Sequence, residues 1–153
     1  MIELARPTSD DIHYIIENMC AADADEVWAS HRHTPKQAVE GGVAMSDYVS
    51  VARYDGVPIG IYGLVVRDIL GGEGVPWMLT TDGMRRAGRE LLTVVPRGID
   101  EMFRVCDRLS NHVYTENKMS IRWLRRLGFI IEPPLPVGMG GELFHEFHMT
   151  KVD

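Results

Sequence analysis

The sequence predicts a single α/β domain in which helices cover a mixed β-sheet. Strand-like and helix-like patterns alternate along its 153 residues, which indicates helices packed on a sheet. An Asp55-Gly56 pair between two strand-like runs predicts a β-hairpin. The chain is close to the commonest size of one domain, and its 45% hydrophobic and 25% charged residues are the balance of an ordinary globular protein.

The N-terminal segment predicts a strand followed by a helix. Residues Ile2 to Ala5 alternate, and Arg6-Pro7 ends the run. Thr8 and Asp11 stand at the positions of a capping box, so the helix begins there. The apolar residues that follow recur at helical spacing: Ile12, Ile15, Ile16, Met19 and Cys20.

A second helix is predicted before the hairpin. From Ala21 to Ser30 the helical pattern is weaker. Thr34-Pro35-Lys36-Gln37 then gives a new start signal, with a cap, a proline at the first helical position and a glutamine that reaches back. Gly41-Gly42 predicts the end of this helix.

Three strands follow, the first two joined by the hairpin turn. Tyr48 to Tyr54 and Val57 to Val66 flank Asp55-Gly56, a pair favoured in type I′ turns because both central residues need positive φ. A loop over Gly71 to Gly74 leads to the third strand, Pro76 to Thr81.

The second half of the chain predicts two helical regions and three strands. Residues 84–95 and 97–108 have a helical pattern, and Pro96 between them predicts a break or kink. The remaining elements are a strand over Asn111 to Thr115, a helix over Lys118 to Leu127 ended by Gly128, and strands over Phe129 to Glu132 and Leu143 to Met149 joined by a loop from Pro133 to Gly141. The predicted order is β-α-α-β-β-β-α-β-α-β-β, in one domain over residues 1–153.

The charge balance argues against a nucleic-acid-binding protein. The net charge is −6, from 22 acidic and 16 basic side chains, whereas such proteins need a basic surface. A local basic patch exists at Arg122, Arg125 and Arg126, and a solvated helix face is its simplest interpretation.

We expect no membrane span and no signal peptide. Cys20 and Cys106 lie in helical apolar patterns, which predicts buried thiols in a reducing compartment.

The segment from Glu116 to Phe129 combines a capping asparagine, a helix and a Gly-Phe pair. Asn117 caps the helix, Gly128 takes the left-handed position at its end, and Phe129 returns to the core. With the element order around it, this segment resembles the GNAT superfamily of acyl-CoA-dependent N-acetyltransferases. The resemblance implies a GNAT-like fold, a central mixed sheet flanked by helices, and acetyl-CoA as the cofactor.

A narrower resemblance covers most of the chain. Pro76 to Asp82, Ser110 to Tyr114 and Ser120 to Leu124 are similar to the GNAT-like internal virion protein A family of short-tailed bacteriophages. This resemblance implies a protein made in the cytoplasm of the infected bacterium and associated with the virion or its assembly. Its partners would then be other virion proteins, such as portal, tail or internal proteins, with no nucleic acid expected.

The GNAT resemblance places the CoA pyrophosphate on main-chain N–H groups at a helix start. The family pattern has Arg or Gln, then two residues, Gly, one residue, and Gly or Ala. It aligns with Arg85 to Glu90, where Arg85 takes the first position and Gly88 the position of the first glycine. Glu90 departs from the pattern, because a carboxylate repels a pyrophosphate; Arg85, Arg86 and Arg89 could supply phosphate contacts. The rest of the cofactor would lie between the Trp77–Thr81 and Asn111–Thr115 strands, and the groups implied to hold it there belong to Leu79, Thr80, Thr81 and Asn117.

The same resemblance implies a general acid, in many members a tyrosine four residues before the glycine of the Gly-Phe pair. That position is Leu124, which cannot donate a proton, and Tyr114 is the nearest substitute. Asp82 and His112 are candidate bases for the acceptor amine. Asp82 equally suits an N-cap, and structural roles remain the alternative for His112 and Tyr114.

Two functions therefore remain open from the sequence, with a third that has no specific support. The first is a virion or assembly component with little or no acetyltransferase activity. The second is an acetyl-CoA-dependent N-acetyltransferase that modifies an amine on a host or phage protein, and the third is an acidic decoy that acts on a host protein. No metal site is predicted, because His31 and His33 lack ligand spacing and His145 and His148 fall on opposite faces of a strand.

Overall fold

A computed structural model of the chain describes residues 1–68 and 70–152. The strands are β1 (Ile2–Ala5), β2 (Tyr48–Tyr54), β3 (Val57–Asp68), β4 (Glu73–Thr80), β5 (Arg108–Tyr114), β6 (Ile130–Leu135) and β7 (Phe144–Thr150). The helices are α1 (Ser9–Asn18), α2 (Ala21–His31), α3 (Pro35–Met45), the 3₁₀ helix η1 (Asp82–Ala87), α4 (Gly88–Met102) and α5 (Lys118–Leu127). The predicted α/β class with a mixed sheet flanked by helices is confirmed.

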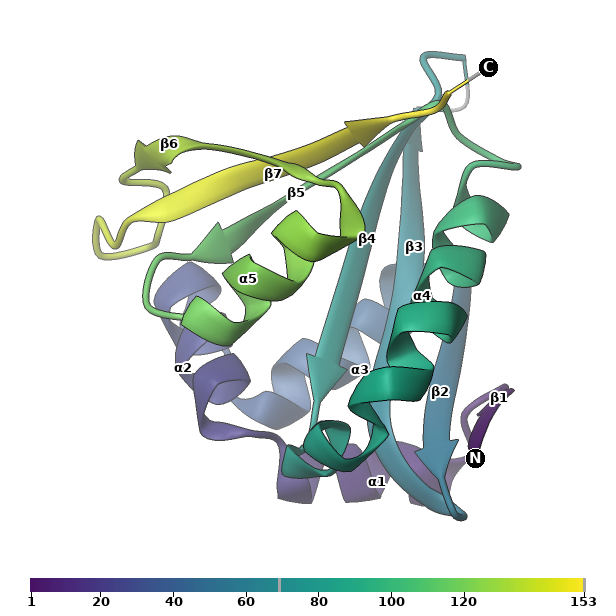
Figure 1. The fold of residues 1–153 in the computed structure, drawn as a ribbon. Coiled ribbons are helices and arrows are strands. Elements are labelled where there is room, and N and C mark those ends of the chain that lie inside the picture. Colours follow the sequence, from purple (N-terminus) through teal and green to yellow (C-terminus); the bar gives the residue numbers. More distant parts are fainter. Residues whose placement is uncertain (69, 153) are drawn as a thin grey trace.

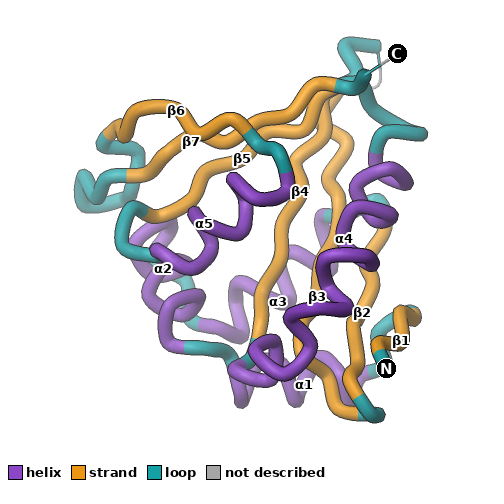
Figure 2. Tube along the Cα trace, viewed as in Figure 1, coloured by secondary structure: helices purple, strands orange, loops and turns teal. Residues whose placement is uncertain are grey.

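The seven strands of the described residues form one sheet in the order β1-β2-β3-β4-β5-β7-β6. All neighbouring strands are antiparallel except β4 and β5, which run parallel. These two strands pair only at Glu73 with Arg108 and at Gly74 with Leu109, near their N-terminal ends. Beyond this point they diverge, and Figures 1 and 2 show the V-shaped opening that results.

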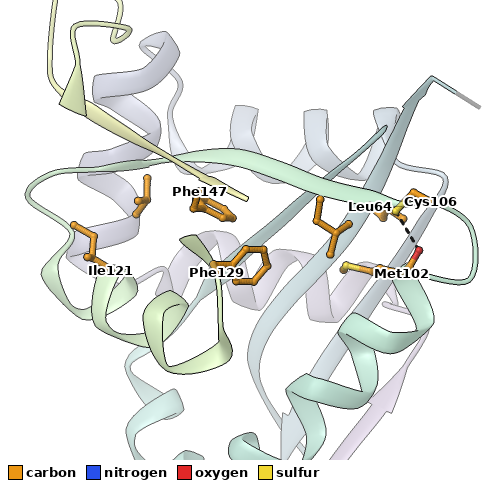
Figure 3. Packing of buried hydrophobic residues seen from close by; sticks show 8 residues of the cluster. Leu64, Met102, Cys106, Ile121, Phe129 and Phe147 are labelled. Atoms are coloured by element: carbon orange, nitrogen blue, oxygen red, sulfur yellow. Dashed lines mark hydrogen bonds between the residues drawn. The ribbon is translucent and has the colours of Figure 1, made fainter. Parts of the chain in front are cut away.

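Helices cover both faces of the sheet. On one face, Ile15 of α1 and Val39 of α3 pack on Ile61 and Leu79 of the sheet. On the other, α4 and α5 cover a larger cluster, part of which Figure 3 shows: Leu64, Met102, Cys106, Leu109, Val113, Ile121, Phe129 and Phe147. The burial of these side chains fixes α4 and α5 over the diverging strands.

The local signals of the sequence are confirmed. Thr8 and Thr34 each form a capping box, with Asp11 and Gln37 respectively. At the hairpin turn Asp55 and Gly56 both have positive φ, 51° and 84°. Gly128 ends α5 in the left-handed conformation with φ 100°.

The prediction that Gly41-Gly42 ends a helix is wrong, because α3 continues to Met45. A Cβ atom at Gly42 would lie 2.9 Å from the indole ring of Trp77, so this glycine provides space for Trp77 inside a continuous helix. Ser46 caps the C-terminal end of the helix, and its hydroxyl donates to the Gly42 carbonyl and accepts from Trp77 Nε1, both at 2.6 Å.

The predicted number and bounds of the helices also need correction. The weak region after Ala21 is a separate helix, α2, so three helices precede β2 instead of two. The regions predicted over 84–95 and 97–108 are η1 followed by one helix, α4, with Pro96 inside it. Packing outweighs the missing N–H of the proline, because α4 buries Leu91 before it and Met102 after it.

Several strand bounds differ from the predictions. β4 begins at Glu73, inside the predicted glycine loop, and β6 runs through Pro133 and Pro134 to Leu135. β6 is an edge strand, where prolines are tolerated.

The pairing of β2 with β3 contains a register shift between Ala52 and Arg53. It lets Ile59 pack with α4, although the alternation of side chains along β3 would place Ile59 with Ile61 on the opposite face.

The two cysteines do not lie inside helices as predicted. Cys106 is buried after the end of α4, where its thiol donates to the Met102 carbonyl at 3.2 Å (Figure 3). Cys20 is half-buried at the N-cap of α2.

Within residues 1–68 and 70–152, no helix combines the length and apolar character that a membrane crossing requires.

Candidate functional site between strands β4 and β5

The opening between β4 and β5 is the place where the sequence predicts a cofactor. Main-chain groups of alternate strand residues point to the same edge, so Pro76, Met78 and Thr80 of β4 face the opening. On the other side, the N–H groups of His112 and Tyr114 lie along β5. A ligand that enters the opening would use these groups as hydrogen-bond partners.

Helix α2 occupies the groups at the end of β4. The Asp23 carboxylate accepts from the Thr80 main-chain N–H at 2.8 Å and from the Thr80 hydroxyl at 2.7 Å. The Thr80 carbonyl accepts from the Cys20 N–H at 2.9 Å, and Met19 pairs with Thr81 as an isolated bridge. The start of α2 therefore adds to the β4 edge in the way a short extra strand would.

The same helix reaches β5 through a second carboxylate. Glu26, one turn after Asp23, accepts from the Tyr114 main-chain N–H at 2.9 Å. Since Asp23 holds β4 and Glu26 holds β5, α2 connects both walls of the opening, as its position in Figure 1 shows.

Asn117 joins the two carboxylates. Its Nδ2 donates to Asp23 Oδ1 at 3.1 Å and to Glu26 Oε1 at 3.3 Å, while its Oδ1 accepts from Ser120 N at 3.4 Å and caps α5. Asn117 is only 2% exposed and Asp23 only 5%. The predicted cap is confirmed, but the amide that could have met a cofactor is committed to α2.

A second side chain crosses the opening closer to its apex. Asn111 Nδ2 donates to the Pro76 carbonyl at 2.8 Å, and Asn111 Oδ1 accepts from the His112 N–H at 2.7 Å. Pro76 has no N–H to offer. Of the three β4 residues that face the opening, only Met78 keeps main-chain groups that none of these side chains occupies.

The environment of Glu26 shifts its titration toward neutral pH. Burial, together with the nearby Asp23 charge, raises the pKa of this carboxyl to about 7, although the hydrogen bonds from Tyr114 and Asn117 act in the opposite direction. With this pKa the Glu26 carboxyl changes its charge near neutral pH.

The predicted pyrophosphate cradle differs from its expected form. The helical turn begins at Asp82, and η1 runs directly into α4 with Gly88 in the right-handed helical conformation. Thr81, which was also predicted to hold the cofactor, is buried, and its hydroxyl accepts from Gly83 N at 3.2 Å. Glu90 points to the N-terminal strand, where it accepts from the Ile2 N–H at 2.8 Å.

The basic residues of that region remain available to an anion. Arg85, Arg86 and Arg89 are exposed, and no ion pair joins them to the described part of the chain. Gly88 is exposed as well, and a Cβ atom there would meet nothing within 4 Å. These residues fit the phosphates of acetyl-CoA.

The opening does not fit the rest of that cofactor. The pantetheine arm would need the main-chain groups that Asp23, Glu26 and Asn111 occupy. Leu79, also predicted to hold the cofactor, is 6% exposed and packs in the core under α1 and α3. The fit to acetyl-CoA is therefore limited to its anionic end.

The three predicted catalytic residues, Asp82, His112 and Tyr114, do not contact one another through hydrogen bonds, and each has a different environment. Asp82 is exposed and is the first residue of η1. The alternative role predicted for it, the N-cap, belongs instead to Thr81, one residue earlier. His112 is exposed on β5, and the Tyr114 ring packs on Phe144 with centroids 5.2 Å apart. No hydrogen bond between their side chains occurs in the described ranges.

The histidines form no metal centre among the residues that the structure describes. His31 and His33 stack on each other with ring centroids 5.5 Å apart. His145 Nδ1 contacts the Glu132 carbonyl, and His148 Nε2 contacts the Glu132 carboxylate, each at 2.8 Å.

The sequence did not identify Asp23, Glu26 and Asn111 as residues of the site. The signal that could have found the first two is their i, i+3 spacing, which places Asp23 and Glu26 on one side of α2, while the third acid of this helix, Asp25, lies on another side. Their partners are 57 and 88 positions away in the chain, so no local pattern could name them.

Comparisons with known proteins agree with the fold. The sequence matches no protein-family model and no curated protein. The candidate acetyltransferase yncA from Salmonella typhimurium, solved with its cofactor acetyl-CoA, is similar with a TM-score of 0.73 and 18% identity, over 100% of this chain and 95% of that chain. A spermidine N-acetyltransferase from Vibrio cholerae in complex with CoA and spermine gives 0.70 and 13%, over 97% and 95%.

A candidate phosphinothricin N-acetyltransferase is similar as well, with a TM-score of 0.70 and 14% identity over 100% of both chains. At these identities the similarity shows the fold. The chain has the GNAT acetyltransferase fold that the sequence predicted.

Proposed function

We propose that this protein uses the GNAT fold as a binding scaffold in a bacteriophage particle or its assembly, with little or no acetyl transfer. The observation that carries this proposal is the closure of the β4–β5 opening by α2. Asp23 and Glu26 hold the two strands at 2.8 and 2.9 Å, where an acyl-CoA arm would need the same main-chain groups.

Opening the site would disrupt a connected polar network. Displacement of α2 would leave Asn117, which is buried, without the two carboxylates it contacts. Buried polar groups that lose their partners are destabilising, so the closed state is favoured over an open one. Leu124 at the expected position of the general acid supports the same conclusion.

The partners follow from the narrower sequence resemblance. We expect other virion proteins, such as portal, tail or internal proteins, to bind this chain in the cytoplasm of the infected bacterium and in the particle. Mass spectrometry of purified particles tests this part. Absence of the chain from particles and from complexes with any phage protein would contradict it.

Titration calorimetry with acetyl-CoA and with CoA tests the loss of the cofactor site. We expect no binding of either ligand by the wild-type protein at millimolar concentration. A variant with Asp23→Ala and Glu26→Ala serves as the comparison, since it frees the groups on both strands. Micromolar binding by the wild-type protein would overturn the proposal.

An active N-acetyltransferase that modifies an amine on a host or phage protein is the second candidate. Two observations favour it: the exposed Arg85, Arg86 and Arg89 suit phosphates, and the Glu26 pKa of about 7 suits a general base at neutral pH. Under this function Asn117→Ala should weaken cofactor affinity, and Glu26→Gln should lower turnover with cofactor affinity retained. Unchanged affinity in Asn117→Ala would count against this placement of the cofactor.

A further inference from the structure

The charges of this protein are divided between the two faces of its sheet. Residues 1–47, which include α1 to α3, carry nine acidic and three basic side chains. Residues 82–128, which include α4 and α5, carry six acidic and ten basic side chains. The net charge of −6 therefore conceals a basic face on the α4–α5 side.

Six arginines form the centre of this face, and we call them the arginine surface: Arg85, Arg86, Arg89, Arg122, Arg125 and Arg126. All six are exposed. Arg32, Arg53 and Arg108, by contrast, pair with carboxylates. No ion pair joins any of the six to a residue within 1–68 or 70–152, so their charges are available to a partner.

The two groups of arginines belong to one surface because their helices touch. Trp123 of α5 packs against the cluster that contains Ala87 and Leu91 at the start of α4. Figure 1 shows both helices on the same side of the sheet. Arg122 and Arg126 lie one and three positions from Trp123, so they belong to the helix that packs beside the start of α4.

Arg89 lies in the first turn of α4, whereas Arg85 and Arg86 lie in the last turn of η1, which runs directly into α4. Cations near the N-terminal end of a helix interact unfavourably with its dipole, whereas Arg125 and Arg126 in the last turn of α5 interact favourably. α5 contains no acidic residue at all. The dipole of α4 therefore does not favour Arg89 at this position, whereas an external anion would interact favourably with all three arginines.

We infer that the arginine surface binds the phosphate backbone of a nucleic acid strand. Six cations spread over η1, α4 and α5 need an extended polyanion, and arginine binds phosphate through paired N–H groups. The exposed large apolar side chains nearby are Met119 and Leu92, too few for the apolar core of a protein interface. Nucleic-acid interfaces are more polar and more positively charged, as this surface is.

This inference requires that Arg85, Arg86 and Arg89 do not hold the phosphates of a cofactor, and it uses no group inside the β4–β5 opening. It departs from the expectation drawn from net charge, because that expectation treats the molecule as uniformly charged. A protein that is acidic overall can bind nucleic acid through one basic face, provided that the salt concentration does not screen it.

Fluorescence anisotropy with labelled 20-nucleotide single-stranded and double-stranded DNA tests the inference, with potassium chloride varied from roughly 50 to 200 mM. We expect a dissociation constant of about 1–100 μM at the lowest salt concentration and a slope of log K against log salt of about −3 to −4 for the single strand, as four to six phosphate contacts give. The absence of binding to both DNAs would overturn the inference.

Two triple variants locate the surface. Arg122→Gln/Arg125→Gln/Arg126→Gln and Arg85→Gln/Arg86→Gln/Arg89→Gln should each weaken binding about tenfold or more and reduce the steepness of the salt slope by about 2. The control is Arg6→Gln/Lys36→Gln/Arg67→Gln, which removes the same charge from exposed residues elsewhere. Equal losses in the control, or a loss in only one arginine triple, would contradict a surface that joins both groups.

Competition separates the other anionic partners. Excess CoA and poly-glutamate should displace the DNA only at concentrations far above that of unlabelled DNA. Displacement by CoA at micromolar concentration would assign the arginines to a cofactor phosphate and overturn the inference. Displacement by poly-glutamate with equal efficiency would overturn it in favour of an acidic protein partner.

Discussion

Glu26 of helix α2 accepts a hydrogen bond from the main-chain N–H of Tyr114 in strand β5, at 2.9 Å and 88 positions along the chain. Together with the bond between Asp23 and Thr80, it occupies main-chain groups on both walls of the opening between β4 and β5. A side chain from a helix thus occupies the place where a GNAT fold offers main-chain groups to a ligand. The chemistry of this contact can be tested through its response to pH.

Glu26→Gln should make the protein more stable at alkaline pH. The raised pKa of about 7 means that the folded state holds the proton more tightly than the unfolded state, where the pKa is near 4.5. Wild-type stability therefore falls as pH rises through this window, by up to about 3 kcal/mol by pH 8. Glutamine keeps the acceptor for Tyr114 but carries no charge, so urea unfolding of this variant should show little of that fall between pH 5 and 8. Equal falls in both proteins would contradict the role of Glu26.

The Asp11–Arg53 pair should give the opposite dependence on pH. Hydrogen bonds from Arg53 at 2.9 and 2.6 Å lower the pKa of Asp11 to about 2, below its usual value of 3.8. This pair stabilises the protein above the unfolded pKa, and the contribution is lost as pH falls toward 2. Asp11→Asn should cost about 2 kcal/mol in urea unfolding at pH 7, with the difference shrinking below pH 4.

Glu3→Gln is the control for that measurement. Glu3 also pairs with Arg53, at 2.6 Å, but its side chain is 65% exposed. Exposed pairs contribute little, so this change should cost less than about 1 kcal/mol. A cost as large as that of Asp11→Asn would mean that burial of Asp11 does not set the strength of the pair.

Two adjacent glycines of α3 should respond to alanine in opposite directions. A Cβ at Gly41 meets nothing within 4 Å, so Gly41→Ala should raise stability by about 0.5–1 kcal/mol through helix propensity. A Cβ at Gly42 would lie 2.9 Å from the Trp77 ring, so Gly42→Ala should lower it by about 1–3 kcal/mol. Thermal unfolding of both variants checks the pair, and a gain in stability at both positions would contradict the packing of Trp77 on α3.

Asn111→Ala should loosen the diverging strands. The variant loses the bond to the Pro76 carbonyl and the acceptor for the His112 N–H. We expect a cost of about 1–3 kcal/mol and faster hydrogen exchange of the His112 amide. His112→Ala is the control, since the His112 side chain is exposed and its main-chain amide is retained. Unchanged exchange in Asn111→Ala would show that Asn111 does not hold the opening together.

The features that the sequence predicted depend on neighbours within a few positions. The capping boxes at Thr8 and Thr34, the turn at Asp55-Gly56 and the end of α5 at Gly128 are all of this kind. Each is a hydrogen-bonding or φ requirement of a short segment, so the residue types alone identify it.

The features that it missed depend on contacts across the chain. The length of α3 depends on Trp77, which donates to Ser46 from 31 positions away. The closure of the opening depends on Asp23 and its partner Thr80, 57 positions apart. The sequence indicated that Glu90 departs from the cofactor-binding pattern. The hydrogen-bond donor that Glu90 contacts, the Ile2 N–H, could be found only from the fold.

The prolines of β6 limit how copies of this molecule can associate. β6 forms one edge of the sheet, and neither Pro133 nor Pro134 has an N–H to donate. A strand from another chain could not form a continuous ladder along this edge. Growth of the sheet into fibres or strand-linked dimers is therefore blocked on that side, and assembly there has to use side chains.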